Sequence, residues 1–191
     1  MLFRSDFQRH LSRIPPADGV PRIVALLGGT IGNFPPGTRR GLLREIRTLL
    51  RSEDRLLLGT DLVKDPAVIE AAYNDPGGVT AEFNRNLLRV INRELDADFE
   101  PEAFEHVAFY DRDREWIEMR LRATRPCRVR VAALGLAVQF AAGEELRTEI
   151  SAKFSRGRLA ADFAAAGLEL TDLWTDPDEL FAVSLAAPAR R

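Results

Sequence analysis

A carboxylate and a hydroxyl stand two residues apart at Glu149 and Ser151, in a segment with strand character. Residues two apart on a strand share one face, so both side chains would point the same way. Such a pair suits an imidazole ring, since one ring N–H would donate to Glu149 and Ser151 would serve the other nitrogen as donor or acceptor. The alternative is a solvated strand face, which is the usual environment of glutamate.

Two further side chains could bind a small polar molecule. The amide of Asn33, in a glycine-spaced loop after an apolar run, both donates and accepts, so it could hold the carboxylate and the amine of an amino acid together. The phenol of Tyr73 could donate to a carboxylate, and Thr30 and Thr80 could add polar contacts. The structural alternatives are a turn for Asn33 and a half-buried core position for Tyr73, while Met119 by itself is typical of a core residue.

The first part of the chain predicts a βαβ arrangement. An apolar run over 23–27 stops at Gly28–Gly29, as in a strand buried on both faces. Residues 38–50 carry leucines and an isoleucine at helical spacing, with Thr38 as the expected N-cap, and a second apolar run follows over 56–58. Strand, helix and strand with short connections predict a parallel sheet.

The middle of the chain is predicted to be an inserted α+β unit. Helices are expected over 66–74 and 79–95, and from about residue 104 the apolar period drops to two, which indicates antiparallel strands. One polar group in this part is interpreted as a loop without an assigned role, and it consists of Asp61, Lys64 and Asp65. A second polar group is interpreted as an exposed strand face, and it consists of Glu118, Arg120 and Arg122.

The end of the chain returns to the first pattern. A short helix over 157–166 ends at Gly167, and strands over 168–174 and 180–185 predict a hairpin. Parallel strands that close with an antiparallel hairpin are typical of the second half of a class I, Rossmann-like methyltransferase sheet. The predicted fold class is therefore α/β, with an incomplete sheet of this type and an inserted substrate-binding unit. The predicted divisions are 1–60 with 156–191 for the sheet, and 61–155 for the insertion.

Composition and charge argue against several classes of function. Acidic residues number 29 and basic residues 27, for a net charge of −2, so nucleic acid and anionic membranes are poor candidate partners. The single cysteine, Cys127, excludes an internal disulfide and fits a reducing, cytoplasmic location. His10 and His106 have no partner spacing for metal or nucleophilic chemistry, so no metal is implied. No apolar run is long enough to span a membrane.

Six short sequences are more specific than the pattern of strands and helices, because together they resemble a known family. They are LGGTIGN at 27–33, LGTDLVKD at 58–65, FNRN at 83–86, NREL at 92–95, IEMRL at 117–121 and TEISAKF at 148–154. In this order and spacing they resemble the histidine-specific methyltransferase family, whose members make hercynine from histidine and S-adenosylmethionine (SAM) in ergothioneine biosynthesis. The resemblance runs from about Asp6 to Leu185.

This resemblance implies a substrate and a set of site residues. The substrate would be L-histidine, methylated three times on its α-amino group. Asn33 and Tyr73 would bind its carboxylate, and Met119, Glu149 and Ser151 would surround its imidazole. We expect these five side chains to converge on one pocket.

The cofactor side is expected to be incomplete. The resemblance places an adenine-contacting pair at Asp6 and Phe7, whereas Gly28–Gly29 lacks the Gly-x-Gly-x-x-Gly spacing of a cofactor loop and is interpreted as a substrate loop. The family's enzymes are longer at the N-terminus, so we expect a C-terminal part with the SAM site largely outside it. The alternative is a non-catalytic remnant, or a subunit that binds substrate or a partner chain supplying the N-terminal cofactor half. In either case the strand over 23–27 should have a free edge.

Overall fold

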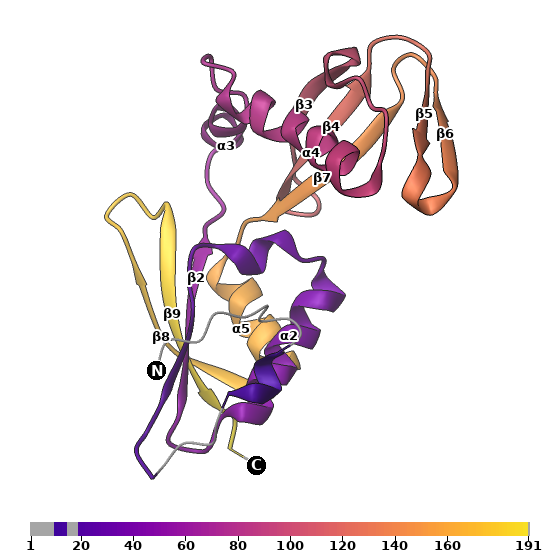
Figure 1. The fold of residues 1–191 in the computed structure, drawn as a ribbon. Helices are drawn as coiled ribbons and strands as arrows, with labels where there is room; N and C mark the ends of the chain where they lie inside the picture. Colours follow the sequence, from indigo (N-terminus) through magenta and orange to yellow (C-terminus); the bar gives the residue numbers. More distant parts are fainter. Residues whose placement is uncertain (1–9, 15–18, 191) are drawn as a thin grey trace. The chain divides into compact units, whose positions relative to one another are not determined.

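The computed structural model describes residues 10–14 and 19–190, which form two compact units (Figure 1). The first unit comprises the described residues up to Lys64 together with those from Ala152 onward, and the second is Asp65–Ser151. Asp6 and Phe7 lie outside the described residues. Within the described part of the chain, no helix is long and apolar enough to cross a membrane.

The first unit is built on a four-stranded sheet with the spatial order β1-β2-β9-β8. Its strands are β1 Ile23–Leu26, β2 Arg55–Asp61, β8 Leu168–Thr175 and β9 Phe181–Pro188, and a 3-10 turn, η1, spans Leu11–Arg13. β1 runs parallel to β2, whereas β9 is antiparallel to both β2 and β8. The predicted parallel pair and closing hairpin are confirmed, and β1 lies at an edge of the sheet that the described strands form, as expected.

Two helices, α2 Pro36–Leu49 and α5 Arg156–Ala165, lie side by side next to this sheet (Figure 1). Arg39 of α2 donates through Nε to Oδ2 of Asp162 in α5 at 2.8 Å, and both side chains are buried. The prediction of Thr38 as N-cap is wrong, because α2 begins at Pro36. Proline is already fixed near the helical φ and has no N–H that needs a partner, so it can start a helix without a capping side chain.

The 3-10 turn η2, Thr30–Asn33, follows β1 and carries Asn33 at its end. The two residues before it, Gly28 and Gly29, have φ values of 81° and 71°, a conformation that glycine adopts at low cost. At Gly32, a Cβ would stand 2.9 Å from the carbonyl oxygen of Ala152. The turn therefore lies close to the main chain at Ala152, and a larger residue at position 32 would have no room there.

The second unit combines two helices with small antiparallel sheets. Its helices are α3 Pro66–Tyr73 and α4 Val79–Leu95, with the 3-10 turns η3 Pro101–Ala103 and η4 Ala132–Leu134. Its strands are β3 Phe104–Asp111, β4 Trp116–Ala123, β5 Cys127–Val131, β6 Leu136–Phe140 and β7 Glu145–Ala152. One sheet has the order β3-β4-β7, and β5 pairs with β6. The β3–β4 and β5–β6 pairs are antiparallel, as the period of two predicts.

The core of the second unit lies where α4 packs against β3 and β4. Leu88 of α4, Phe104 of β3 and Leu121 of β4 are each at most 1% exposed. Phe104 meets Phe140 of β6 edge-on, with ring centroids 5.3 Å apart, so the β5–β6 ribbon joins the same apolar cluster. This cluster fixes α4 relative to β4.

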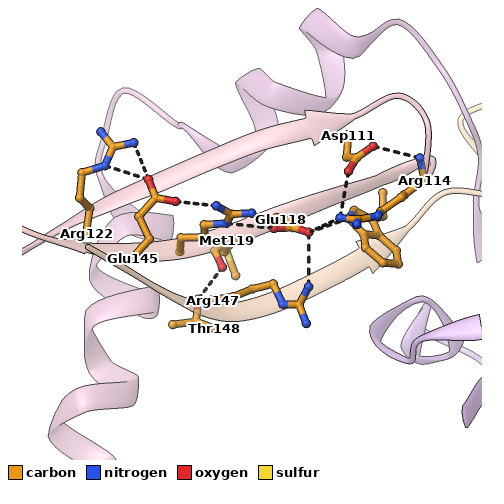
Figure 2. A network of polar contacts seen from close by, with 10 residues as sticks. Asp111, Arg114, Glu118, Met119, Arg122, Glu145, Arg147 and Thr148 are labelled. Atoms are coloured by element: carbon orange, nitrogen blue, oxygen red, sulfur yellow. Dashed lines mark hydrogen bonds and ion pairs between the residues drawn. The ribbon is translucent and has the colours of Figure 1, made fainter. Parts of the chain in front are cut away.

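The prediction of an exposed polar face on β4 is wrong for Glu118, which is fully buried and belongs to the network of polar contacts shown in Figure 2. Its carboxylate accepts hydrogen bonds from Trp116 Nε1 at 3.0 Å and from Arg120 Nε at 2.9 Å. Arg120 and Arg122 in turn each have a guanidinium nitrogen 2.6 Å from the carboxylate of Glu145 in β7. Burial is the largest influence on the pKa of Glu118 and raises it, but the bonds and charge of Arg120 and its neighbours outweigh burial and leave the pKa below its ordinary value.

Glu118→Gln should lower the free energy of unfolding at neutral pH by about 2–3 kcal/mol, because it removes a buried charge and leaves the surrounding arginines facing a neutral amide. A lowered carboxyl pKa contributes stability above the pKa of the unfolded chain, and this contribution is lost as the pH falls through the folded value. The difference between wild type and variant, measured by urea unfolding, should therefore shrink in acid. The control Glu105→Gln removes only an exposed pair with Arg122 and should cost less than about 0.5 kcal/mol. Equal losses in both variants would contradict this account.

Gly32→Ala should lower the free energy of unfolding by about 1–3 kcal/mol, since its Cβ must push η2 away from Ala152. Gly41→Ala is a matched control within α2, where an added Cβ meets nothing within 4 Å. That control should raise stability by about 0.5–1 kcal/mol through helix propensity. Thermal unfolding of both variants checks the pair, and a neutral Gly32→Ala would show that the contact with Ala152 is loose.

Candidate functional site

A cavity of about 220 Å³ lies in the second unit, lined by residues of α4, β4 and β7. The lining residues are Phe83, Asn84, Asn86, Leu87 and Val90 of α4, Met119 of β4, and Thr148 and Glu149 of β7. Apolar and polar side chains both contribute. A cavity of this kind can enclose a small ring while its polar groups bond to the ring edge.

Met119 and Glu149, two of the predicted site residues, both line this cavity. Met119 is 3% exposed, and Glu149 is half-buried. Thr148 Oγ1 donates to the carbonyl oxygen of Met119 at 3.0 Å, which ties β7 to β4 beside the cavity (Figure 2). A thioether provides a soft apolar wall and a carboxylate provides an acceptor, so this part of the cavity suits a ring that carries an N–H.

The other predicted substrate residues lie elsewhere. Ser151 on β7 and Tyr73 at the end of α3 are half-buried in the second unit, but they are not among the described side chains that line the cavity. Asn33 is exposed at the end of η2 in the first unit. The convergence of all five residues on one pocket therefore stays a prediction. Thr80 has a local role, because its N–H donates to Asp75 at the start of α4.

Sequence reasoning missed the α4 side of the cavity. Phe83 and Leu87 recur at helical spacing, which alone is typical of a core face, yet they are 65% and 37% exposed and line the cavity. Asn84 is 2% exposed, and its Nδ2 lies 2.9 Å from Nδ1 of His106 and donates to the carbonyl oxygen of Arg120 at 3.0 Å. The available signal was the FNRN sequence at 83–86, which contributes two of the polar residues of the cavity.

The two carboxylates of the loop after β2 are already engaged, so neither is open as a ribose ligand for a nucleoside cofactor. β2 ends at Asp61, whose Oδ1 lies 2.6 Å from Lys64 Nζ and whose Oδ2 lies 2.7 Å from the Nζ of buried Lys153. Both carboxylate oxygens are therefore engaged by ammonium groups. Asp65, in the same loop, caps α3 by accepting from the N–H of Ala67. This loop thus offers SAM no free carboxylate for its ribose.

Comparisons with known proteins agree on one family. A family model described as "Histidine-specific methyltransferase, SAM-dependent" matches residues 3–188. The chain is 54% identical over 182 residues to the histidine N-alpha-methyltransferase of Mycobacterium tuberculosis, and 53% identical over 181 residues to that of Mycolicibacterium smegmatis. Each alignment covers 95% of this chain but 56% of the relative, so the chain spans little more than half the length of these relatives.

More distant likenesses are found as well. The ergothioneine biosynthesis protein 1 of Neurospora crassa is 28% identical over 183 residues, covering 88% of this chain and 19% of that protein. Among solved structures, the CcbJ methyltransferase of Streptomyces caelestis aligns with 92% of this chain and 61% of its own, at 13% identity and a TM-score of 0.46, so the assignment rests on sequence. With a family match that extends over nearly all its length, the chain belongs to the histidine-specific, SAM-dependent methyltransferases.

Proposed function

We propose that this chain is the histidine-binding part of a SAM-dependent N-methyltransferase that converts L-histidine to hercynine in ergothioneine biosynthesis. The observation that carries the proposal is the cavity lined by both Met119 and Glu149. The names of the mycobacterial relatives support the substrate, and the name of the Neurospora relative supports the pathway.

In this proposal the imidazole of L-histidine enters the cavity. A ring N–H donates to Glu149, Met119 packs against the ring, and Ser151 bonds to the second ring nitrogen. Asn33 and Tyr73 bind the carboxylate. Because these bonds go to the ring and the carboxylate, the α-amine depends on no fixed N–H bond and can accept three methyl groups in succession. The chain's contribution to the reaction is therefore positioning.

SAM supplies the methyl group when it is bound. We infer that it is held mainly by residues outside the described part of the chain, with Asp6 and Phe7 among them as the resemblance implies. The engagement of Asp61 by Lys64 and Lys153 supports this inference, because it removes the acidic group at the end of β2 as a ribose ligand.

A second candidate is a subunit that binds histidine without catalysing its methylation. It is favoured by β1, which lies at the edge of the described sheet, with Ile23 62% exposed and the adjacent Leu27 53% exposed. An apolar strand at a sheet edge can pair with a strand of another chain. The two candidates agree on histidine binding and differ in product formation.

Glu149→Ala should weaken the binding of L-histidine by about 10- to 150-fold, the range expected for a hydrogen bond to a charged group. Isothermal titration calorimetry on the chain measures the dissociation constant. Glu94→Ala, at the exposed end of α4, is the control and should change the affinity by less than about twofold. Unchanged affinity in Glu149→Ala, or equal losses in the two variants, would remove Glu149 from the ring site.

The chain incubated with L-histidine and SAM should form no hercynine above a control without protein, because Asp61 is already paired with two lysines and most of the SAM site is proposed to lie outside the described residues. Mass spectrometry of the reaction mixture measures the product. Hercynine above the control would show that the cofactor site is complete, and it would exclude the non-catalytic candidate.

A further inference from the structure

His106 of β3 connects Asn84 with Tyr73 through its two ring nitrogens. Its Nδ1 lies 2.9 Å from Nδ2 of Asn84, and its Nε2 lies 2.9 Å from the carbonyl oxygen of Tyr73. Asn84 lines the cavity, and Tyr73 is the predicted ligand of the substrate carboxylate. The imidazole of His106 therefore bridges α4, which forms one wall of the cavity, and the last residue of α3.

The bonds of Asn84 determine how this ring is protonated. Nδ2 of Asn84 also lies 3.0 Å from the carbonyl oxygen of Arg120. Because a carbonyl oxygen can only accept, the amide nitrogen of Asn84 must be the atom that points toward Arg120 and His106. Nδ1 of His106 must then accept the second N–H of that amide. Nε2 consequently carries the proton and donates to the carbonyl of Tyr73, which makes the ring the neutral Nε2–H tautomer.

The bonds of His106 and Asn84 have one consequence at Tyr73 and another at the cavity. The Tyr73 carbonyl belongs to the last turn of α3, where carbonyls lack intrahelical donors, so the bond from His106 fixes the main chain at Tyr73. At the other end both N–H groups of Asn84 are used, which leaves Oδ1 as the polar atom that this side chain can offer to the cavity. Oδ1 and the Glu149 carboxylate are both acceptors that line the cavity, so together they suit a single ring N–H, and the second ring nitrogen is left to Ser151.

We propose that His106 is a positioning residue of the histidine site, which orients the Asn84 amide so that its oxygen serves the ligand. The inference rests on the proposed function, because it names L-histidine as that ligand. It adds that recognition of the ring depends on His106, a side chain that is not among the described residues lining the cavity.

Asn74 supplies a matched control. Its Nδ2 donates to the carbonyl oxygens of Glu70 and Ala108 at 3.0 and 3.1 Å, so it also ties the end of α3 to β3. Neither bond involves the Asn84 amide. Asn74→Ala therefore loosens the same helix end without changing how Asn84 is oriented.

The first measurement is the tautomer of His106. Nitrogen-15 NMR of the imidazole in the ligand-free wild-type chain should show a protonated Nε2 and an unprotonated Nδ1. A ring in the Nδ1–H form, or one that exchanges rapidly between the two forms, overturns the proposal. This result does not depend on whether L-histidine binds.

The second measurement is the affinity for L-histidine. His106→Phe should weaken binding at least about tenfold, whereas His106→Gln, whose amide both donates and accepts, should stay within about threefold of wild type, as should Asn74→Ala. Equal losses in His106→Phe and Asn74→Ala, or no recovery in His106→Gln, overturn the proposal because they indicate general loosening of α3. Should His106→Phe not fold, the glutamine variant and the tautomer still decide. Should the wild type bind no L-histidine, the proposed function fails, and the tautomer alone decides the role of His106.

Discussion

A carboxylate buried in the central strand of a sheet stays ionised only when cationic groups or hydrogen-bond donors surround it, and Glu118 imposes this condition on β4. Arg120 of the same strand and Arg147 of β7 meet it. The residues that follow Glu118 then serve the cavity, because Met119 lines it and the carbonyl of Arg120 holds the Asn84 amide. Glu118, Met119 and Arg120 are consecutive positions of β4, so the ionic face of the sheet and one wall of the cavity are built on the same strand.

The secondary structure could be predicted wherever apolar residues recur with a clear period. The strands β1 and β2 and the helix α4 follow from short apolar runs and amphipathic spacing, which are local properties of the sequence. Thr38 failed as a cap because the proline before it already begins the helix. The prediction that Glu118 is exposed was wrong because a period of two assigns a side chain to a face of the strand but says nothing about how deeply that face is covered.

The site depends on contacts that no local pattern records. Met119 and Glu149 line one cavity because β4 and β7 are neighbours in the sheet, and only the family resemblance associated them beforehand. His106 is separated by 22 positions from Asn84 and by 33 from Tyr73, so the spacing of the two histidines could not reveal its partners. The sequence pattern alone therefore indicates no role for His106, although the fold gives its ring two hydrogen-bond partners.

The bonds of His106 also limit how the substrate nitrogen can be made reactive. A general base needs a lone pair that is open to the proton it removes. In the neutral Nε2–H ring the available lone pair is on Nδ1, and it is directed at the Asn84 amide. His106 therefore cannot deprotonate the α-amine of a bound amino acid without breaking that bond. Before each methylation, the ammonium form of the proposed substrate would therefore have to lose its proton to water or to a group other than His106.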